Sequence, residues 1–210
     1  MNFQVKNPLL GTLAIFSSLF SGLAFAHSGH DVSVGFVSGV LHPFTGLDHL
    51  LVIVLVGFWS AFVLKKIWVG PCMFLCEMCL GVVAGLANVP LGFFEYGIAA
   101  SVIAIGVMLL LKNQYSPQSI LLLIGSFGVF HGIAHTDQFA GSSIGFLFVV
   151  QDLLGLILAT GVLHLCGALL VKVLKEKTLI FAKIAGMSSV IYGLFLIGQL
   201  AFLTIGGVST

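Results

Sequence analysis

Two short histidine-rich segments stand out because the chain has few other polar groups. The first, HPFTGLDH, runs from His42 to His49, and the second, FHGIAHTDQ, runs from Phe130 to Gln138. Both lie at or inside segments apolar enough to cross a membrane, where a polar side chain is costly and usually serves a function. Imidazole and carboxylate groups together suit divalent transition metals. The two segments therefore indicate a membrane protein that handles such an ion.

The second segment has the spacing of a helical metal site. His131 and His135 are four residues apart and share one helix face, so two imidazoles can bind one ion. Gln138 extends the same face, and Asp137 lies off it near the expected helix end. The alternative is that both histidines only pack between helices and hydrogen-bond to neighbours. Two imidazoles on one face of an otherwise apolar span favour the ligand role.

The first segment marks the start of a helix. Thr45 and Asp48 have the spacing of a capping box, which predicts a helix that begins near Thr45. A capping role for Asp48 leaves His42 and His49 unexplained, and a helix start at a break in the membrane is a place where transporters bind ions. His42, Asp48 and His49 are therefore candidate ligands. Both segments fall in the outer halves of their predicted spans and can meet at a similar depth.

Three further polar residues fall within the expected spans. Asp152 is a candidate for charge balance or ion relay at the same site, unless it pairs with Gln151 or a backbone group. Glu77 and His164 are candidates for an exit path, with pairing to a neighbour as the alternative for each.

The composition sets the fold class. Of 210 residues, 59% are hydrophobic and 7% are charged, whereas soluble domains carry roughly 25% charged residues. A net charge of +1 gives no indication of a nucleic-acid partner. The chain is therefore expected to be an all-α, polytopic transmembrane bundle whose partners are the lipid bilayer and a divalent ion. Homo-oligomer formation is left open.

Six apolar runs are each long enough to cross the roughly 30 Å hydrocarbon core. They cover about 45–64, 67–88, 93–111, 118–138, 143–171 and 179–207. The segment Val32–Leu41 is too short to span and ends at His42 and Pro43, which predicts a half-helix on the outer side. With six spans and the N-terminus outside, every lysine after the first 26 residues falls on the cytoplasmic side, as the positive-inside rule requires.

The first 26 residues read as a cleaved signal peptide. Lys6 supplies the basic region, Leu9–Phe20 the apolar region, and Ala24–Ala26 the cleavage site, so residues 27–210 form one transmembrane domain. An uncleaved first span is the alternative. Together these features predict a multi-pass protein of a bacterial inner membrane with its mature N-terminus outside.

Cleavage would place His27 at the new N-terminus, with His30 close behind. Short histidine-rich tracts are weak metal-binding signals, and a solvated tail is the equal alternative.

Cysteine and glycine spacings suggest packing rather than chemistry. Cys72, Cys76 and Cys79 share one helix face, and with Cys166 they are expected to act as small buried hydrophobic residues rather than as a thiolate site. Two pairs of glycines have the small-xxx-small spacing that lets helices approach closely: Gly81 with Gly85, and Gly128 with Gly132.

The two histidine segments resemble the signatures of the HupE/UreJ family. HPFTGLDH matches every fixed position of H-P-x-x-G-x-D-H, and FHGIAHTDQ resembles F-H-G-x-A-H-G-x-E. The second departs where Thr136 replaces Gly and Gln138 replaces Glu, which bears on the identity of the metal. The resemblance implies nickel or cobalt permeation that supplies hydrogenase, urease or cobalamin pathways. It also implies a functional role for the residues at the matching positions: His42, Asp48, His49, His131 and His135.

The sequence therefore predicts a secondary transporter that imports a divalent ion, Ni²⁺ or Co²⁺ before Zn²⁺ or Cu²⁺, with no permanently bound cofactor and no enzymatic activity. One alternative is a haem-binding protein that draws its axial ligands from His49, His131, His135 or His164. A zinc hydrolase is disfavoured because Gly132 stands where H-E-x-x-H requires Glu. A non-transporting accessory protein is the remaining alternative.

Overall fold

The computed structural model describes residues 35–87, 93–111, 114, 116–137, 139 and 145–205. The expected signal peptide, His27, His30 and Gln138 lie outside this part of the chain, as does the side chain of Asp137.

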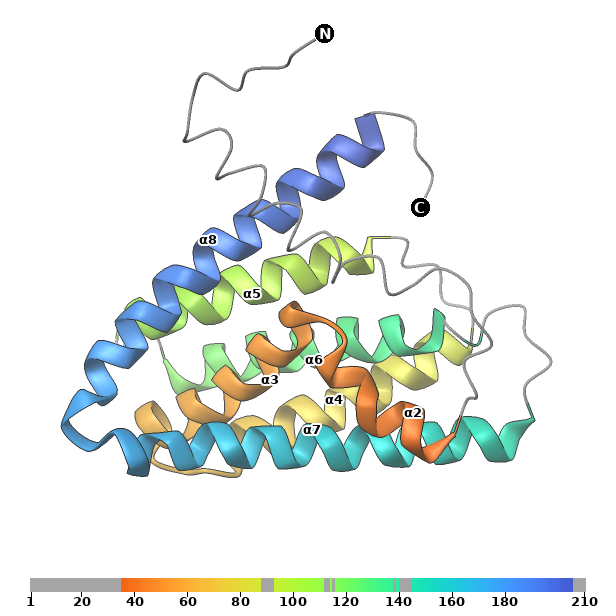
Figure 1. Cartoon of the computed structure of the whole chain (residues 1–210), viewed down its shortest axis with the longest axis horizontal. Helices are drawn as coiled ribbons and strands as arrows, with labels where there is room; N and C mark the ends of the chain where they lie inside the picture. The colour runs from red at the N-terminus through yellow and green to blue at the C-terminus, as the bar shows by residue number, and fades with distance from the viewer. Residues whose placement is uncertain are drawn as a thin grey trace, which may run out of the picture.

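Each of the six apolar runs forms a helix, which confirms the predicted all-α membrane bundle (Figure 1). The helices are α3 (Leu47–Trp59), α4 (Val69–Leu86), α5 (Phe94–Leu110), α6 (Pro117–Asp137), α7 (Phe146–Leu174) and α8 (Thr178–Ile205). A π-helical turn, η2 (Ser60–Leu64), extends α3, and a short 3-10 turn, η3 (Lys175–Lys177), joins α7 to α8.

Length and hydropathy support the membrane assignment. In the described part of the chain, four stretches are long and apolar enough to cross a bilayer: Leu47–Leu64, Val69–Leu86, Pro117–Thr136 and Phe146–Ile205. The last stretch contains both α7 and α8. Helix α5 is apolar and has 17 residues, which gives it a length of about 26 Å, close to the thickness of the hydrocarbon core.

The short element before α3 is a half-helix, as predicted, but it does not end at His42. Helix α2 (Phe36–Leu41) continues into a 3-10 turn, η1 (His42–Phe44). Pro43 is tolerated there because it lies in the first turn, where its missing N–H has no partner to lose. The extra turn carries His42 toward the start of α3.

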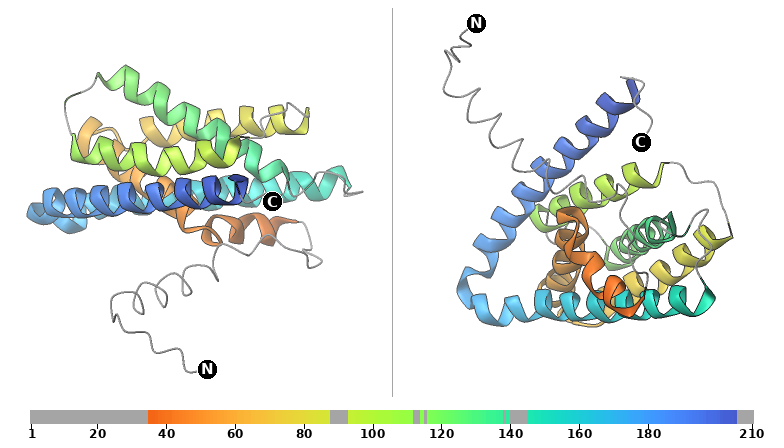
Figure 2. Two further views of the ribbon diagram at one scale, coloured as in Figure 1. Left: turned by 90° about the horizontal axis from the view of Figure 1, so that it is seen from above. Right: turned by 45° about the vertical axis from the view of Figure 1, so that its right-hand side comes forward.

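Glycines set the closest helix contacts. A Cβ on Gly81 of α4 would collide with the carbonyl oxygen of Val129, and a Cβ on Gly132 of α6 would collide with that of Met78. The two small-xxx-small pairs therefore face each other, and α4 and α6 pack backbone to backbone as their spacing indicated. Figure 2 shows the other close pairs, α5 along α8 and α3 along α7.

The half-helix α2 is held against α7 in the same way. A Cβ on Gly39 would collide with the carbonyl oxygen of Asp152, and a Cβ on Gly155 would collide with that of Phe36. The α3–α4 and α7–α8 turns lie together at one end of the bundle, on the left in Figure 1, whereas α2 lies toward the opposite end.

The four cysteines do not lie in the core. Cys72, Cys76, Cys79 and Cys166 are all exposed on the surface of the bundle, so the expectation that they are buried is wrong. A thiol is apolar enough to face lipid as readily as the protein interior.

Candidate metal centre

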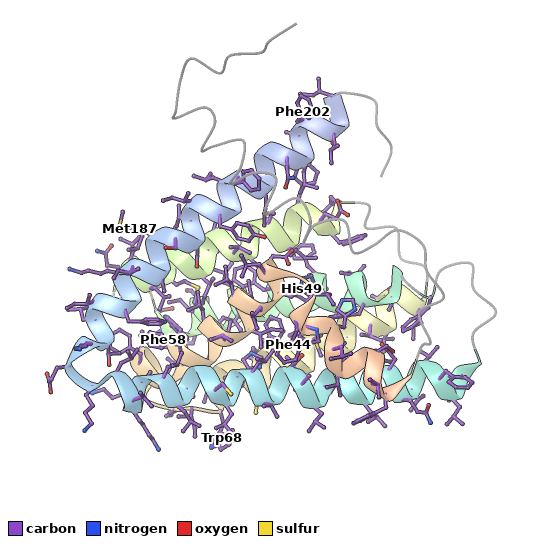
Figure 3. All side chains as sticks on the ribbon, in the orientation of Figure 1. Phe44, His49, Phe58, Trp68, Met187 and Phe202 are labelled. Carbon is purple, nitrogen blue, oxygen red and sulfur yellow. The ribbon has the colours of Figure 1, made fainter. Side chains whose placement is uncertain are left out.

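Three imidazoles from three separate elements converge inside the bundle. His42 comes from η1, His49 from the first turn of α3 and His135 from the last turn of α6. One ring nitrogen from each lies within 4.8 Å of the others. The ring centroid of His42 lies 4.2 Å from that of His135 and 5.9 Å from that of His49. Figure 3 shows His49 inside the bundle. We call His42, His49 and His135 the histidine cluster.

Asp48 orients the His49 ring. Its Oδ1 atom accepts a hydrogen bond from the backbone N–H of His49 at 2.8 Å and lies 3.0 Å from Nδ1 of the same residue. Because the carboxylate favours a proton on Nδ1, the lone pair of the neutral ring is on Nε2. That atom is buried and has no hydrogen-bond partner among the described residues. At metal sites, a histidine that binds the ion commonly donates its other ring N–H to a carboxylate in this way.

Gly46 makes room for this pair. It is the N-cap of α3, and a Cβ there would collide with Oδ1 of Asp48 and lie 3.2 Å from Nδ1 of His49. The predicted capping box is wrong. The hydroxyl of Thr45 donates to the carbonyl oxygen of His42 at 2.7 Å instead of accepting from the start of α3.

His131 adjoins the cluster one turn deeper in α6. Its ring centroid lies 4.7 Å from that of His49, and the residue is 1% exposed. Nδ1 lies 2.8 Å from the carbonyl oxygen of Phe127, which can only accept, so Nδ1 carries the proton. Among the described residues, Nε2 of His131 has no hydrogen-bond partner. His131 and His135 thus share a helix face as expected, but His135 is the one grouped with His42 and His49.

Asp152 has a structural contact of its own. It is 1% exposed, and its Oδ1 atom accepts a hydrogen bond from the hydroxyl of Ser38 in α2 at 2.5 Å. This bond reinforces the glycine contacts between α2 and α7. Asp152 therefore anchors the element that leads into His42. Of the other acidic residues in the helices, the exit-path candidate Glu77 is half-buried and Glu95 is exposed.

Thr136 has a clear packing role. Its hydroxyl donates to the carbonyl oxygen of Ile133 at 2.7 Å, and a Cβ on Gly85 of α4 would collide with the Thr136 side chain. Gly85 therefore leaves the space that the threonine occupies beside His135.

Sequence reasoning missed several residues around the centre. Phe74 of α4 is fully buried, and its ring contacts that of His131, with centroids 5.3 Å apart. Nothing in its spacing or neighbours distinguishes it from the other phenylalanines among the 19 in the chain. Gly46 and Ser38 were also missed, although the fixed glycine of the HPFTGLDH segment was a signal for the first.

Two comparisons with known proteins found relatives. Residues 14–196 match the family described as HupE / UreJ protein. Protein HupE of Rhizobium leguminosarum bv. viciae is 30% identical over 168 residues, which cover 80% of this chain and 83% of the relative. No solved structure matches.

Proposed function

The chain belongs to the HupE/UreJ family, and from that membership and the geometry of its centre we propose that it is a permease that imports a divalent transition-metal ion. In this proposal the ion binds the histidine cluster, with Asp48 behind His49, and then passes His131 on its way inward.

The observation that carries the proposal is the convergence of buried ring nitrogens. Burying a polar atom without a hydrogen-bond partner costs free energy. Among the described residues, neither Nε2 of His49 nor Nε2 of His131 has such a partner. An ion that accepts their lone pairs would remove that cost. Neutral imidazoles without a thiolate also suit permeation, because the site must strip water from the ion and still release it.

The identity of the ion comes from the family resemblance. By the Irving–Williams order, a site of nitrogen ligands alone would bind Cu²⁺ most tightly, so geometry and supply must set the selectivity. We propose Ni²⁺ or Co²⁺ as the transported ion, with Zn²⁺ and Cu²⁺ as the competitors to test. His27, His30, Asp137 and Gln138 would then assist capture, and Asp152 would add negative charge near the path.

The contacts between the rings favour an ion over haem. The rings of His42 and His135 meet edge to face, as do those of His49 and His131. A porphyrin cannot lie between two imidazoles that are already in contact. A small ion needs only a modest adjustment of the same side chains.

Lysine placement supports import toward the end of the bundle opposite α2. Lys65, Lys66, Lys172, Lys175 and Lys177 lie at or beside the α3–α4 and α7–α8 turns. The positive-inside rule assigns this end to the cytoplasm of a bacterial inner membrane. An inside-negative potential then favours entry by about 2.3 kcal/mol per charge per 100 mV, and by twice that for a divalent ion.

The test is uptake of radiolabelled Ni²⁺ and Co²⁺ into cells that express the chain. We expect accumulation by the wild type and loss of it in a His49→Ala/His131→Ala double variant at matched membrane levels, because both substitutions remove ring nitrogens from the path. Gly161→Ala is the control, since no described atom beyond its chain neighbours and its own helical turn lies within 4 Å of the added Cβ. Accumulation no higher than in empty cells, with expression confirmed, would reject Ni²⁺ and Co²⁺ import.

A further inference from the structure

A second buried polar pair lies on α7, outside the histidine cluster. His164 and Thr160 are one turn apart and are 1% and 0% exposed. Nδ1 of His164 lies 2.9 Å from the carbonyl oxygen of Thr160 and must donate to it, which leaves the lone pair on Nε2. Within the described residues, neither Nε2 of His164 nor Oγ1 of Thr160 has a hydrogen-bond partner. Two such atoms on residues one turn apart are unusual, because buried polar atoms are nearly always paired.

A continuous series of ring contacts joins this pair to the cluster. His49 contacts His131, and the ring of Phe74 lies 5.3 Å from those of both His131 and His164. Helix α7 runs from the end of the bundle near α2 to the lysine-rich end, and His164 lies in its second half. His164 is therefore farther along the inward direction than the cluster.

The backbone at His164 is held firmly in place. A Cβ on Gly57 of α3 would collide with the carbonyl oxygen of His164, so the two backbones are in contact. A Cβ on Gly167, one turn further along α7, would collide with the carbonyl oxygen of Val54. These contacts fix where the ring can reach, which is what a preformed ligand requires.

We propose that Nε2 of His164 and Oγ1 of Thr160 form an inner binding site, which takes the divalent ion after it leaves the histidine cluster and passes His131 and Phe74. This inference rests on the proposed function. One nitrogen and one hydroxyl oxygen would bind the ion more weakly than three imidazoles. A weaker second site lets the ion move on, because conduction needs binding at several sites that each release it.

His164→Asn separates a ligand role from a structural one. The asparagine amide can still donate to the carbonyl oxygen of Thr160, but it places no lone pair where Nε2 was. We expect this variant to lose Ni²⁺ and Co²⁺ uptake to the level of empty cells. Leu163→Val, at the neighbouring buried position, is the packing control and should transport normally. Uptake by His164→Asn within about twofold of wild type would overturn the proposal.

Binding provides a second and independent readout. The chain, with His27→Ala and His30→Ala to remove their imidazoles, is titrated with Co²⁺ in lipid nanodiscs and followed by visible absorption. We expect two binding phases, of which His164→Asn keeps the tighter and loses the weaker. A single phase in the parent, or two unchanged phases in the variant, would overturn the inner site. Two phases without uptake by wild-type cells would instead reject import and leave the inner site standing.

Discussion

At the scale of single residues, three histidines share one arrangement. His49, His131 and His164 each place Nδ1 within 3.0 Å of an oxygen that only accepts, which puts the lone pair of the neutral ring on Nε2. In all three, Nε2 is buried without a hydrogen-bond partner among the described residues. In the proposed function, the nitrogens are thus oriented before an ion arrives, and its binding would need little reorganisation.

Asp48 is expected to act through His49. Asp48→Ala removes the acceptor that orients the ring, and Asp48→Asn keeps an acceptor but loses the negative charge. We expect the concentration of Ni²⁺ needed for half-maximal uptake to rise by about 10- to 100-fold in the alanine variant, with a smaller rise for asparagine. The measurement is the concentration dependence of radiolabelled Ni²⁺ uptake at matched membrane levels. The same half-maximal concentration in all three proteins would show that Asp48 does not tune the site.

At the scale of elements, the half-helix α2 must sit tightly on α7 for His42 to reach the cluster. Gly39 and Gly155 bring the two backbones together, and the hydrogen bond from Ser38 to Asp152 joins the side chains. A short helix of six residues has little stability of its own, so these contacts with α7 fix its position.

Gly39→Ala is expected to displace His42 from the cluster. Alanine is the better helix former by about 1 kcal/mol, so a loss must come from the collision of its Cβ with the carbonyl oxygen of Asp152. We expect Ni²⁺ binding to weaken by about tenfold or more, as after loss of one ligand. Gly161→Ala, on α7 in open space, is the matched control and should bind as wild type. Equal binding by both variants would mean that the docking of α2 does not position His42.

At the scale of the whole molecule, the bundle has two distinct ends. One carries the lysine-rich α3–α4 and α7–α8 turns, and α2 lies toward the other (Figure 1). The histidine cluster lies at the start of α3 and the end of α6, on the α2 side. In the proposed function, this asymmetry would give the ion a polar entry at one end and a deeper apolar stretch beyond it.

The expected orientation can be measured by cysteine labelling. In a chain whose four cysteines are replaced by serine, Glu95→Cys near the start of α5 should react with a membrane-impermeant maleimide in intact spheroplasts. Lys177→Cys, at the α7–α8 turn, should react only after permeabilisation, because the positive-inside rule predicts that its end of the bundle faces the cytoplasm. Both positions are exposed, so packing within the protein does not hide either of them from the reagent. The reverse pattern would place the lysine-rich end outside.

The helices and most of the candidate ligands could be read from the sequence. Continuous apolar runs must form helices in a bilayer, because every backbone polar group has to be satisfied within its own segment. A polar side chain within an apolar, membrane-spanning segment is costly, so histidines in such segments stand out, which is why His42, His49 and His135 were identified as candidates. The close packing of α4 against α6 could also be predicted from their paired glycines, because small residues at that spacing let helices approach closely.

Only the tertiary structure decided which of these residues meet. Spacing along α6 grouped His131 with His135, yet His135 lies with His42 and His49 because α2 docks on α7 and carries His42 to the end of α6. The link from His131 through Phe74 to His164 joins three helices. The spacing of residues along the sequence predicts which side chains share a face of one helix. Contacts between helices depend instead on how the surfaces of those helices fit together. The sequence by itself thus determined a helical membrane protein with buried imidazoles, and the packing of its helices decided how those imidazoles are arranged.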